Sequence, residues 1–570
     1  MKRYSSLDFL RGLAIILMLF LHMGTYYLAI DPILANINNE PLINLVALII
    51  FPYLGGLAGL FLLISSIVNM ISMYKRLERG QSVKNLILGQ VVAGVLLLIF
   101  AMLVEALIGY NGALGNLLQH LDDPNQADLL PMLYRWNTFE TIHTIAWCVI
   151  INGTVQGILS RNGKWKNSKR LMIIYITLAI IIVALTQFVW DTVALLVPGY
   201  PFALDPSTGI EIYQPVLGQA NPLYILVSPF LAALAAPMEP LFPYLAVSFI
   251  GSMIGLVITK PREEIPFNFP KRMGLVGGIM FFIGMIGVTS MVFYVFNTQG
   301  FNTAADFFQL ISYHRHWAPD YPYITIPAGA WLWQFFSFTG FSILAVMTLL
   351  RLVEYRGKAG FFADSSTIIR RFGFVAFTNY SFQWIYYITF FLMTNMLVGT
   401  AYQKLDWSGT FLTIGLTFFV YELMMVTWEK KRYIGSIEWM IGTLAFTIFP
   451  KRKIGAYKGQ IWWERGALNV EESFYAAEWV NIVKEHEIKH EIQKESKLAY
   501  KLALISVCTL VFMPIAFVAY NIANESIQTE QENKYNKRAK IISIIGMALV
   551  VIFFALCFFL TPSDVGLVLK

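Results

Sequence analysis

Charged residues are scarce in this chain of 570 residues. They make up 14% of it, whereas soluble domains usually carry about 25%. So few charges cannot cover a water-facing surface, which excludes a soluble enzyme, a nucleic-acid binder and a disordered chain. The three cysteines, Cys148, Cys508 and Cys557, lie in apolar stretches without the spacing of a metal site or a disulfide framework. A disulfide-stapled secreted domain is therefore excluded as well.

Apolar residues are abundant instead. They make up 57% of the chain, and aromatic residues make up 15%. A helix needs roughly 20 apolar residues to cross the hydrocarbon core of a bilayer, and the sequence contains about a dozen such stretches. The composition therefore predicts an all-α polytopic membrane protein.

Long gaps separate the basic residues. No Lys or Arg occurs between Arg11 and Lys75, between Lys84 and Arg135, or within 171–259. Positive charge gathers in the cytoplasmic loops of membrane proteins, and each interval between basic clusters is long enough for two crossings. Ten helices then place every cluster inside, which predicts a multi-pass protein of the cell membrane with a cytoplasmic N-terminus. The net charge of +7 is thus explained without a nucleic-acid partner.

A transmembrane core of about ten helices is predicted for 1–450, followed by a C-terminal extension. The expected spans are 8–30, 43–74, 86–109, 140–160, 171–191, 240–259, 273–296, 326–350, 372–397 and 409–429. Two further apolar pieces, 222–238 and 434–449, are interpreted as re-entrant or interfacial, because prolines interrupt the first and the second is short. Residues 451–500 are predicted to form a charged helical linker, and 501–570 a transmembrane hairpin of about two helices. Since ten helices already return the chain to the cytoplasm, this extension is expected to be dispensable for the chemistry.

Ionisable side chains inside a membrane helix are costly, so each one is a functional candidate. Asp8, Arg11 and His22 share a face of the first helix, because the 11 residues from Arg11 to His22 return to within ~20° of the same direction. His22 then lies ~16 Å beyond Arg11, deep in the membrane. An alternative is that Asp8 and Arg11 anchor the helix end by pairing and that His22 is a packing residue. Glu105 and Glu422 are further acids in apolar stretches, without an evident partner.

Several segments resemble a known family. The string SLDFLRGLAIILMLFLHMG, which begins at Ser6, has an L-D-x-x-R-G opening and an Arg-x10-His spacing. The segments 56–80, 141–147, 377–383 (FTNYSFQ) and 434–439 (IGSIEW) add to the likeness, although Ser66 and Ser436 stand where Gly and Pro are common. Together they resemble the transmembrane acyltransferase superfamily, which includes the heparan-α-glucosaminide N-acetyltransferase catalytic domain, the YeiB-like proteins and the acyltransferase-3 proteins.

The resemblance covers about 5–450 and implies an integral membrane acyltransferase. The expected reaction moves an acyl group, foremost acetyl, from cytoplasmic acyl-CoA to a hydroxyl or amine of a glycan or lipid-linked sugar, without a metal. A homodimer in the lipid bilayer is compatible with this activity. The candidates for catalysis are His22, Asp8 and His143, and the cations nearest to the inner face, as candidates for the phosphates of acyl-CoA, are Arg11, Lys75 and Arg76. In the external segment 313–323, the rings of His314, His316 and Trp317 could stack on a sugar acceptor.

One departure from the family concerns the histidine. The lysosomal enzyme carries its catalytic His in the loop after this helix, but 30–40 here contains none, so His22 would serve, as in the acyltransferase-3 pattern. Imidazole suits acyl transfer because it can deprotonate an acceptor or carry the acyl group itself. Other interpretations stay open: Lys75 and Arg76 as a topology-setting cluster, His143 as a paired helix-end group, and 313–323 as an interfacial aromatic belt.

Two rival functions fit other features. His486-Glu487-Ile-Lys-His490 matches the H-E-x-x-H pattern of zinc metalloproteases, but it lies in a charge-dense run with no evident third ligand. A transporter or flippase of a polar lipid or glycan would also need many helices with a polar central stripe. Against this second rival, the sequence has no evident pair of broken helices in two matching halves.

Overall fold

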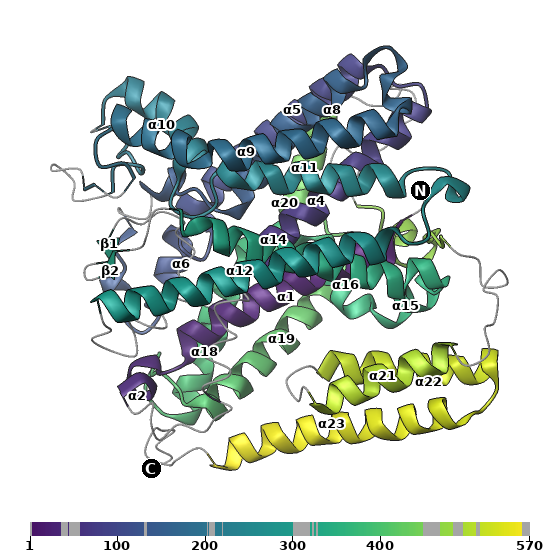
Figure 1. Ribbon diagram of the computed structural model, residues 1–570. Coiled ribbons are helices and arrows are strands. Elements are labelled where there is room, and N and C mark those ends of the chain that lie inside the picture. Colours follow the sequence, from purple (N-terminus) through teal and green to yellow (C-terminus); the bar gives the residue numbers. More distant parts are fainter. Residues whose placement is uncertain are drawn as a thin grey trace.

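The chain is built almost entirely of helices (Figure 1). The computed structural model describes residues 3–35, 44, 57–129, 134–201, 203–204, 211–218, 220–299, 320–321, 324–325, 329–448, 468–482, 494–508 and 513–560. Within these residues, nine helices are long and apolar enough to cross a membrane, which makes the protein a multi-pass membrane protein. They are α1 (Ser5–Tyr27), α4 (Leu57–Glu78), α5 (Val83–Leu103) with its continuation to Leu118, α8 (Thr141–Leu159), α9 (Ser168–Leu196), α11 (Leu241–Ile258), α12 (Phe269–Gln299), α14 (Trp331–Leu352) and α19 (Trp407–Glu429).

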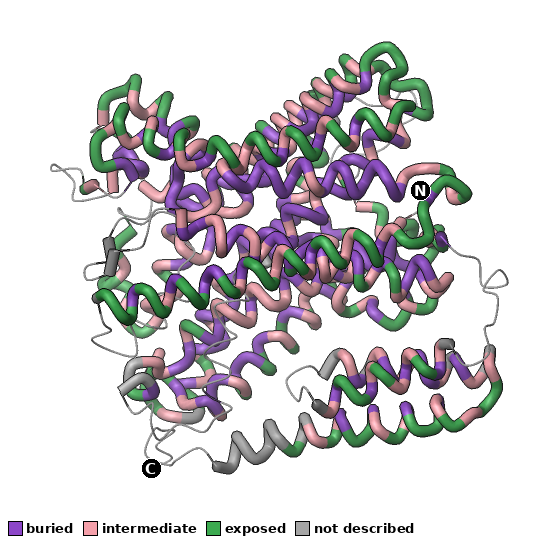
Figure 2. Tube along the Cα trace, viewed as in Figure 1, coloured by how far each residue is buried: buried purple, intermediate pink, exposed green. Residues whose placement is uncertain are grey.

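Small residues allow these helices to pack closely. Helix α11 is the most deeply buried of the nine (Figure 2) and contacts α4, α8 and α9. Helices α12 and α14 lie so close together that a Cβ on Gly284 would stand 2.3 Å from the Ser337 nitrogen, and one on Gly340 would stand 2.3 Å from the Phe281 nitrogen. Membrane helices have no hydrophobic driving force for association, so close backbone approach at small residues provides much of their attraction.

The expected ninth span, 372–397, is broken into short pieces. These are α16 (Thr367–Phe374), α17 (Ala376–Ser381), the 3-10 turn η8 (Phe382–Trp384) and α18 (Ile385–Leu397). Hydropathy does not reveal the breaks, because the stretch is predominantly apolar and its polar residues, such as Asn379 and Gln383, are scattered among apolar ones. Irregular backbone at membrane depth is tolerated only where protein or a water-filled cavity satisfies its polar groups, so the breaks mark a protein-lined region. This is why nine uninterrupted candidates are found where ten spans were expected.

The other described elements are short and join or cover the spans. Helix α10 (Pro222–Ala235) packs against α9 and α11, and α20 (Ile437–Ile448) packs against α5 and α17. Both are shorter than the nine candidates, and their interpretation as non-crossing pieces stays a prediction. The remaining elements are α2 (Ile30–Ala35), η2 (Val104–Ile108), α6 (Ala113–Leu118), η3 (Pro124–Gln126), η4 (Tyr134–Asn137), η5 (Arg161–Lys166), η6 (Arg262–Glu264), η7 (Glu354–Arg356), α15 (Ala359–Ser365) and the antiparallel pair β1 (Asp320–Tyr321) and β2 (Ile324–Thr325).

The chain after α20 forms a segment at the core and then three helices, the last of which contains nearly all of the expected apolar run 540–561. Residues 468–482, which include the π-helix η11 (Glu471–Tyr475), lie against the core, where the backbone of Arg3 bonds to that of Glu478 and Val480. The expected span 500–522 is divided between α21 (Lys494–Cys508) and α22 (Met513–Glu530), which form a bundle with α23 (Lys534–Leu560) beside the core (Figure 1).

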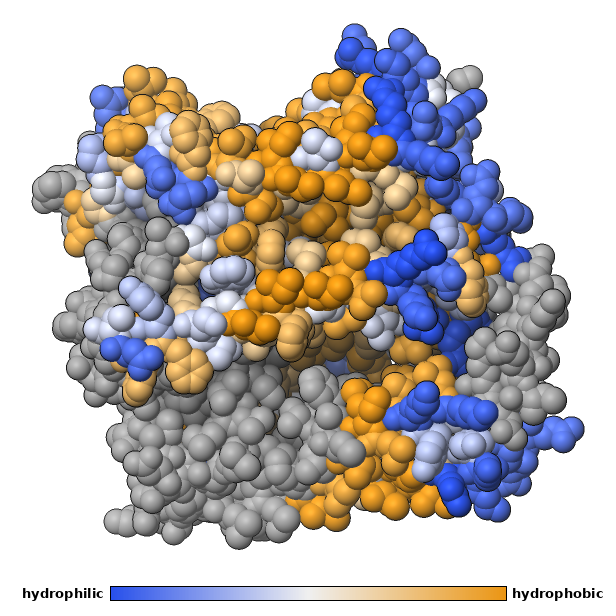
Figure 3. Space-filling model, viewed as in Figure 1, coloured by the Kyte–Doolittle hydropathy of each residue, from blue (hydrophilic) through white to orange (hydrophobic). Residues whose placement is uncertain are grey.

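The basic clusters gather at one end of the molecule. The Tyr74 hydroxyl at the end of α4 donates to the Trp165 carbonyl after α8, and the Tyr4 hydroxyl before α1 donates to the Ile258 carbonyl at the end of α11. We call this side, formed by the start of α1 and the ends of α4, α8 and α11, the basic end. Figure 3 shows hydrophilic residues concentrated along the corresponding edge, with an apolar band beside them.

Candidate functional site

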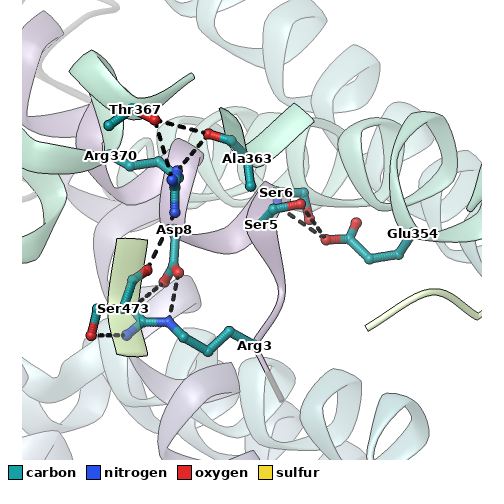
Figure 4. A network of polar contacts seen from close by, with 9 residues as sticks. All are labelled: Arg3, Ser5, Ser6, Asp8, Glu354, Ala363, Thr367, Arg370 and Ser473. Carbon is teal, nitrogen blue, oxygen red and sulfur yellow. Dashed lines mark hydrogen bonds and ion pairs between the residues drawn. The ribbon is translucent and has the colours of Figure 1, made fainter. Parts of the chain in front are cut away.

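An ion pair holds the first turn of α1. Both carboxylate oxygens of Asp8 accept hydrogen bonds from Arg3, at 2.9 Å from Nε and 3.1 Å from Nη2, and Arg3 Nη1 also donates to Ser473 Oγ at 2.8 Å (Figure 4). Asp8 thus pairs with Arg3, whose backbone is bonded to that of Glu478 and Val480, and not with Arg11. Asp8 is also ~21 Å from His22 along the helix, so the structure does not bring these two predicted catalytic residues together.

A buried carboxylate caps the same helix. Glu354 of η7 accepts from the Ser6 nitrogen at 3.0 Å and from the Ser5 hydroxyl at 3.5 Å, as Figure 4 shows. The first N–H groups of a helix lack partners within the helix, and this contact supplies one. The polar groups at the start of α1 are therefore engaged in hydrogen bonds that stabilise the fold.

The predicted donor-binding cations lie in different surroundings. Arg11 stacks over Phe61, with 5.7 Å between Cζ and the ring centroid, and it lines a space of about 10 Å³, which is far too small for a phosphate. Lys75, in the last turn of α4, lines a cavity of about 420 Å³. Arg76 is its neighbour in the sequence but does not line this cavity. Of the three cations, Lys75 is thus the one that faces a space of ligand size in the described part of the chain.

A chain of hydrogen bonds starts at His22. The His22 Nδ1 and Gln383 Oε1 atoms are 2.6 Å apart, and Gln383 Nε2 donates to the Tyr380 carbonyl at 2.9 Å. The Tyr380 hydroxyl in turn donates to Glu105 Oε1 at 2.9 Å. The side chains of Gln383, Tyr380 and Glu105 are buried, and that of His22 is partly buried. We call His22, Gln383, Tyr380 and Glu105 the His22 site.

The hydrogen bonds of Gln383 determine the tautomer of His22. Because the Gln383 amide nitrogen must donate to the Tyr380 carbonyl, the amide oxygen faces His22 and can only accept. His22 Nδ1 therefore carries a proton, and in the neutral ring Nε2 keeps its lone pair. Nε2 is the atom that can act as a base or a nucleophile.

Irregular backbone surrounds the His22 site on two sides. Glu105 lies in η2, a π-helical turn at the end of α5, and Tyr110 follows it. The ring centroids of His22 and Tyr110 are 5.1 Å apart. Tyr380 and Gln383 come from the broken stretch, in α17 and η8. Single π-turns inside helices frequently occur at functional sites, and here the π-turn and the break supply three of the four residues of the site.

The break itself is stabilised by a carboxylate from α20. Glu438 accepts from the backbone nitrogens of Phe377 at 2.7 Å and Thr378 at 3.4 Å, and from the Thr378 hydroxyl at 2.5 Å. Burial raises the pKa of Glu438 above its usual value, although the Thr378 hydrogen bond and the charge of Arg11 act in the opposite direction. Two of the segments that carry the family resemblance, FTNYSFQ and IGSIEW, therefore meet at the start of α17.

No family model matches this chain, and no curated protein matches it. The superfamily resemblance consequently stays a prediction. The function has to be argued from the geometry of the site.

His143 has the opposite arrangement to His22. It occupies the third position of α8, where its Nδ1 accepts from the Glu140 backbone nitrogen at 3.3 Å and the Glu140 side chain accepts from the His143 nitrogen. The ring is 1% exposed and lies against Phe139, with 5.5 Å between centroids. Because Nδ1 accepts, the ring is neutral and Nε2 carries the proton. His143 is a helix-capping group whose remaining ring atom can donate a hydrogen bond.

The other predicted residues are not described. His314, His316 and Trp317 lie outside the described residues, and so do His486 and His490. Among the residues that are described, no group of three or more His, Cys, Asp or Glu side chains is arranged to hold a metal ion. The acceptor site and the zinc hypothesis stay predictions on the sequence alone.

Sequence reasoning did not find the partners of His22. Glu105 and Glu422 were noted as acids without a partner, and the structure supplies Tyr380 for the first and Arg371, at 2.7 Å, for the second. Gln383 and Tyr380 lie within the FTNYSFQ segment, which in the sequence supports only the family resemblance. A buried glutamine beside a buried tyrosine in an apolar stretch was the available signal, since polar groups in membrane helices need partners.

Proposed function

We propose that this protein is an integral membrane acyltransferase that moves an acyl group, foremost acetyl, from acyl-CoA to a hydroxyl or amine of a glycan or lipid-linked sugar. The observation that carries the proposal is the hydrogen bond between His22 Nδ1 and Gln383, which directs the lone pair to Nε2 in a partly buried site. The resemblance of the first helix to the transmembrane acyltransferases supports the same activity.

The chemistry follows from this tautomer. An acceptor hydroxyl or amine attacks the thioester carbonyl, His22 Nε2 takes the proton from the acceptor, and the CoA thiolate leaves and is protonated. In a two-step route, Nε2 attacks the thioester carbonyl and the CoA thiolate leaves. The acceptor then attacks the acyl-imidazole, the bond between Nε2 and the acyl carbon breaks, and the acceptor's proton ends on the thiolate. In both routes Gln383 is a positioning residue, since it holds the ring and stabilises the charge that Nδ1–H develops.

The proposed orientation places the basic end in the cytoplasm. The positive-inside rule supports this orientation, and a donor such as acyl-CoA would then approach from the side of Lys75. Arg11 and Arg76 are proposed as secondary contributors through charge alone, because in the described part of the chain neither lines the cavity that Lys75 faces. The acceptor would approach from the opposite side, where the side chains of His143 and Glu140 lie at the start of α8.

The decisive experiment is turnover by the purified full-length chain. The protein is reconstituted in nanodiscs and incubated with labelled acetyl-CoA and a panel of amino sugars, hexoses and lipid-linked sugars, and released CoA thiol and labelled product are measured. Release of CoA that depends on an acceptor supports the proposal. Absence of both acetyl-CoA binding and CoA release with every acceptor would sink it.

One observation favours the alternative of a transporter or flippase. The broken stretch from α16 to α18 places irregular backbone and polar side chains inside the helical core, as discontinuous helices do in many transporters. Labelled sugar or lipid crossing liposomes that contain the protein, with no acetyl-CoA present, would support transport. In that case the variant His22→Ala would alter substrate movement and not acyl transfer.

A further inference from the structure

The cavity that Lys75 lines lies at the basic end, away from the His22 site. It has a volume of about 420 Å³, which is within the range of small-molecule sites. Three cationic side chains line it, from Lys75 at the end of α4, Lys260 just after α11, and Arg262 in η6. No acidic residue is among its lining residues in the described part of the chain, although the exposed Glu263 and Glu264 follow Arg262 in the sequence.

One wall of this cavity comes from the segment 479–482, which is distant in the sequence. The Val480 nitrogen donates to the Arg3 carbonyl and the Ile482 nitrogen to the Glu354 carbonyl, both at 2.9 Å. Arg262 Nε donates to the Ile482 carbonyl at 2.5 Å. Several backbone hydrogen bonds therefore fix the wall, so the cavity is a built feature and not a gap between loosely placed loops.

An aromatic ring in the same wall is also held in place. The guanidinium of Arg370 stacks over Trp479, with 4.8 Å between Cζ and the ring centroid, and Trp479 lines the cavity. Ordered indole rings provide flat apolar surface next to the cations. The cavity thus combines positive charge with an aromatic wall, and Tyr4, Ile258 and Ile265 add to its lining.

The carbonyl groups at the end of α11, which borders the cavity, are already hydrogen-bonded within the protein. A helix C-terminus carries partial negative charge on its unpaired carbonyl groups. At the end of α11, the Tyr4 hydroxyl donates to the Ile258 carbonyl, and the Thr259 hydroxyl donates to the carbonyls of Gly255 and Leu256. Protein donors therefore occupy these carbonyl oxygens, which reduces the repulsion that they would exert on a bound anion.

We propose that this cavity, lined by Lys75, Lys260, Arg262 and Trp479, binds a phosphate-bearing ligand. Lys and Arg side chains recognise phosphate oxygens through charge-assisted hydrogen bonds, and the neighbouring indole accommodates a flat or apolar part of the ligand. Two sources carry this chemistry: a soluble nucleoside diphosphate and the headgroup of an anionic phospholipid. For a nucleotide ligand this inference rests on the proposed function, since acyl-CoA would bring its own diphosphate to the side of Lys75. The test is nevertheless separate from acyl transfer, because its probes carry no group that is transferred.

The test uses the full-length protein in nanodiscs of zwitterionic phosphatidylcholine, with adenosine 5′-diphosphate as the probe in a calorimetric titration. The variant Lys260→Gln removes one cation of the cavity and is expected to weaken binding about tenfold, the usual loss for one charge-assisted hydrogen bond. The variant Lys75→Gln is expected to do the same. The matched control is Lys271→Gln, an exposed basic residue of the same end that does not line the cavity.

A second arm replaces part of the phosphatidylcholine with phosphatidylglycerol and measures the anionic lipid retained per protein after detergent exchange. Binding of the diphosphate that Lys260→Gln weakens and Lys271→Gln does not supports a nucleotide site. Retention of phosphatidylglycerol that falls in Lys260→Gln but not in Lys271→Gln supports a lipid headgroup site. The proposal is overturned if neither probe binds, or if Lys271→Gln reduces binding as much as Lys260→Gln while thermal melting shows all variants folded.

Discussion

Helix α1 carries an acid at its start and an imidazole near its other end, and the protein holds these two groups in opposite ways. Asp8 has both carboxylate oxygens bonded to Arg3, so both oxygens belong to an ion pair that stabilises the fold. His22 has one ring nitrogen bonded to Gln383, and this bond leaves the lone pair on the other nitrogen. Polar residues on one face of a helix can therefore differ in function, because the structural hydrogen bonds of the fold leave different atoms available.

The two buried histidines extend the comparison. His22 donates through Nδ1, whereas His143 accepts through Nδ1 from the Glu140 backbone. As neutral rings they consequently offer a base at His22 and a donor at His143. The same residue type is thus suited to opposite parts of a proton transfer, and the local partner decides which.

The largest effect is expected from removal of the imidazole in the variant His22→Ala. Transfer should fall by about 10²–10⁴-fold, the range for loss of a general base, while binding of labelled acetyl-CoA stays unchanged. The control is His120→Ala, since His120 bonds to the Asn116 carbonyl outside the His22 site. Turnover in His22→Ala within tenfold of the unmodified protein would reduce His22 to a packing residue and make His143 the next imidazole to test.

A smaller loss of transfer is expected when the orienting amide is replaced. The variant Gln383→Leu should lower kcat about 10- to 100-fold with little change in KM, because a neutral hydrogen bond contributes about 1 kcal/mol and the tautomer is no longer fixed. The variant Gln383→Glu keeps an oxygen for Nδ1–H and should retain more activity than Gln383→Leu. Equal kcat in both variants would show that Gln383 only fills space.

Between the two ends of the polar stripe, close packing of α1 on α16 predicts a loss of stability in the variant Gly12→Ala. A Cβ at Gly12 would lie 1.8 Å from the Ile369 carbonyl oxygen, and such overpacking costs about 1–3 kcal/mol or more. The matched control Gly415→Ala meets nothing within 4 Å and should not be destabilised. Thermal unfolding in nanodiscs measures both, and equal melting temperatures would contradict the close contact.

At the start of α1, a modest structural effect is expected from the variant Asp8→Asn. The Arg3–Asp8 pair is partly exposed, at 29% and 18% of the two side chains, and such pairs contribute about 1 kcal/mol or less. Transfer normalised to folded protein should stay within about twofold. A loss of tenfold or more with an unchanged melting temperature would place Asp8 in the chemistry and remove the contrast with His22.

The smallest effect on transfer is expected when the chain is shortened after Ile482, which removes α21, α22 and α23. The ion pair of Arg356 with Glu495, at 2.8 Å, connects that bundle to the core. A chain that ends near 460 should be less stable, because it also loses Ser473 and the wall 479–482. Equal melting temperatures for the two truncated chains would show that 468–482 does not support the core.

Much of the architecture followed from the sequence. Hydropathy and the gaps between basic residues predicted spans that correspond to the nine candidate helices, since a helix in a bilayer must be apolar and long whatever its neighbours are. The short pieces around α10 and α20 were recognised for the same reason. Helical periodicity also placed Asp8, Arg11 and His22 on one face of α1.

The breaks in the stretch from α16 to α18 could not be read from composition. They depend on Glu438, a residue from another element that supplies hydrogen bonds to the start of α17. The packing of 468–482 against the core is likewise a matter of contacts with Arg3 and Glu354. Neither feature leaves a periodic pattern in the chain, because each is made between residues that are distant in sequence.

The sequence by itself determined that the chain is a helical membrane protein and that His22 lies inside the first helix. Tertiary structure decided which ring nitrogen of His22 keeps a lone pair, that Asp8 is committed to Arg3, and that Lys75 rather than Arg11 faces a cavity. The physical reason is that apolarity and helical spacing are local properties of the chain. The protonation and availability of a polar atom depend instead on the partner that the fold brings to it, and for His22 that partner, Gln383, is 361 residues away.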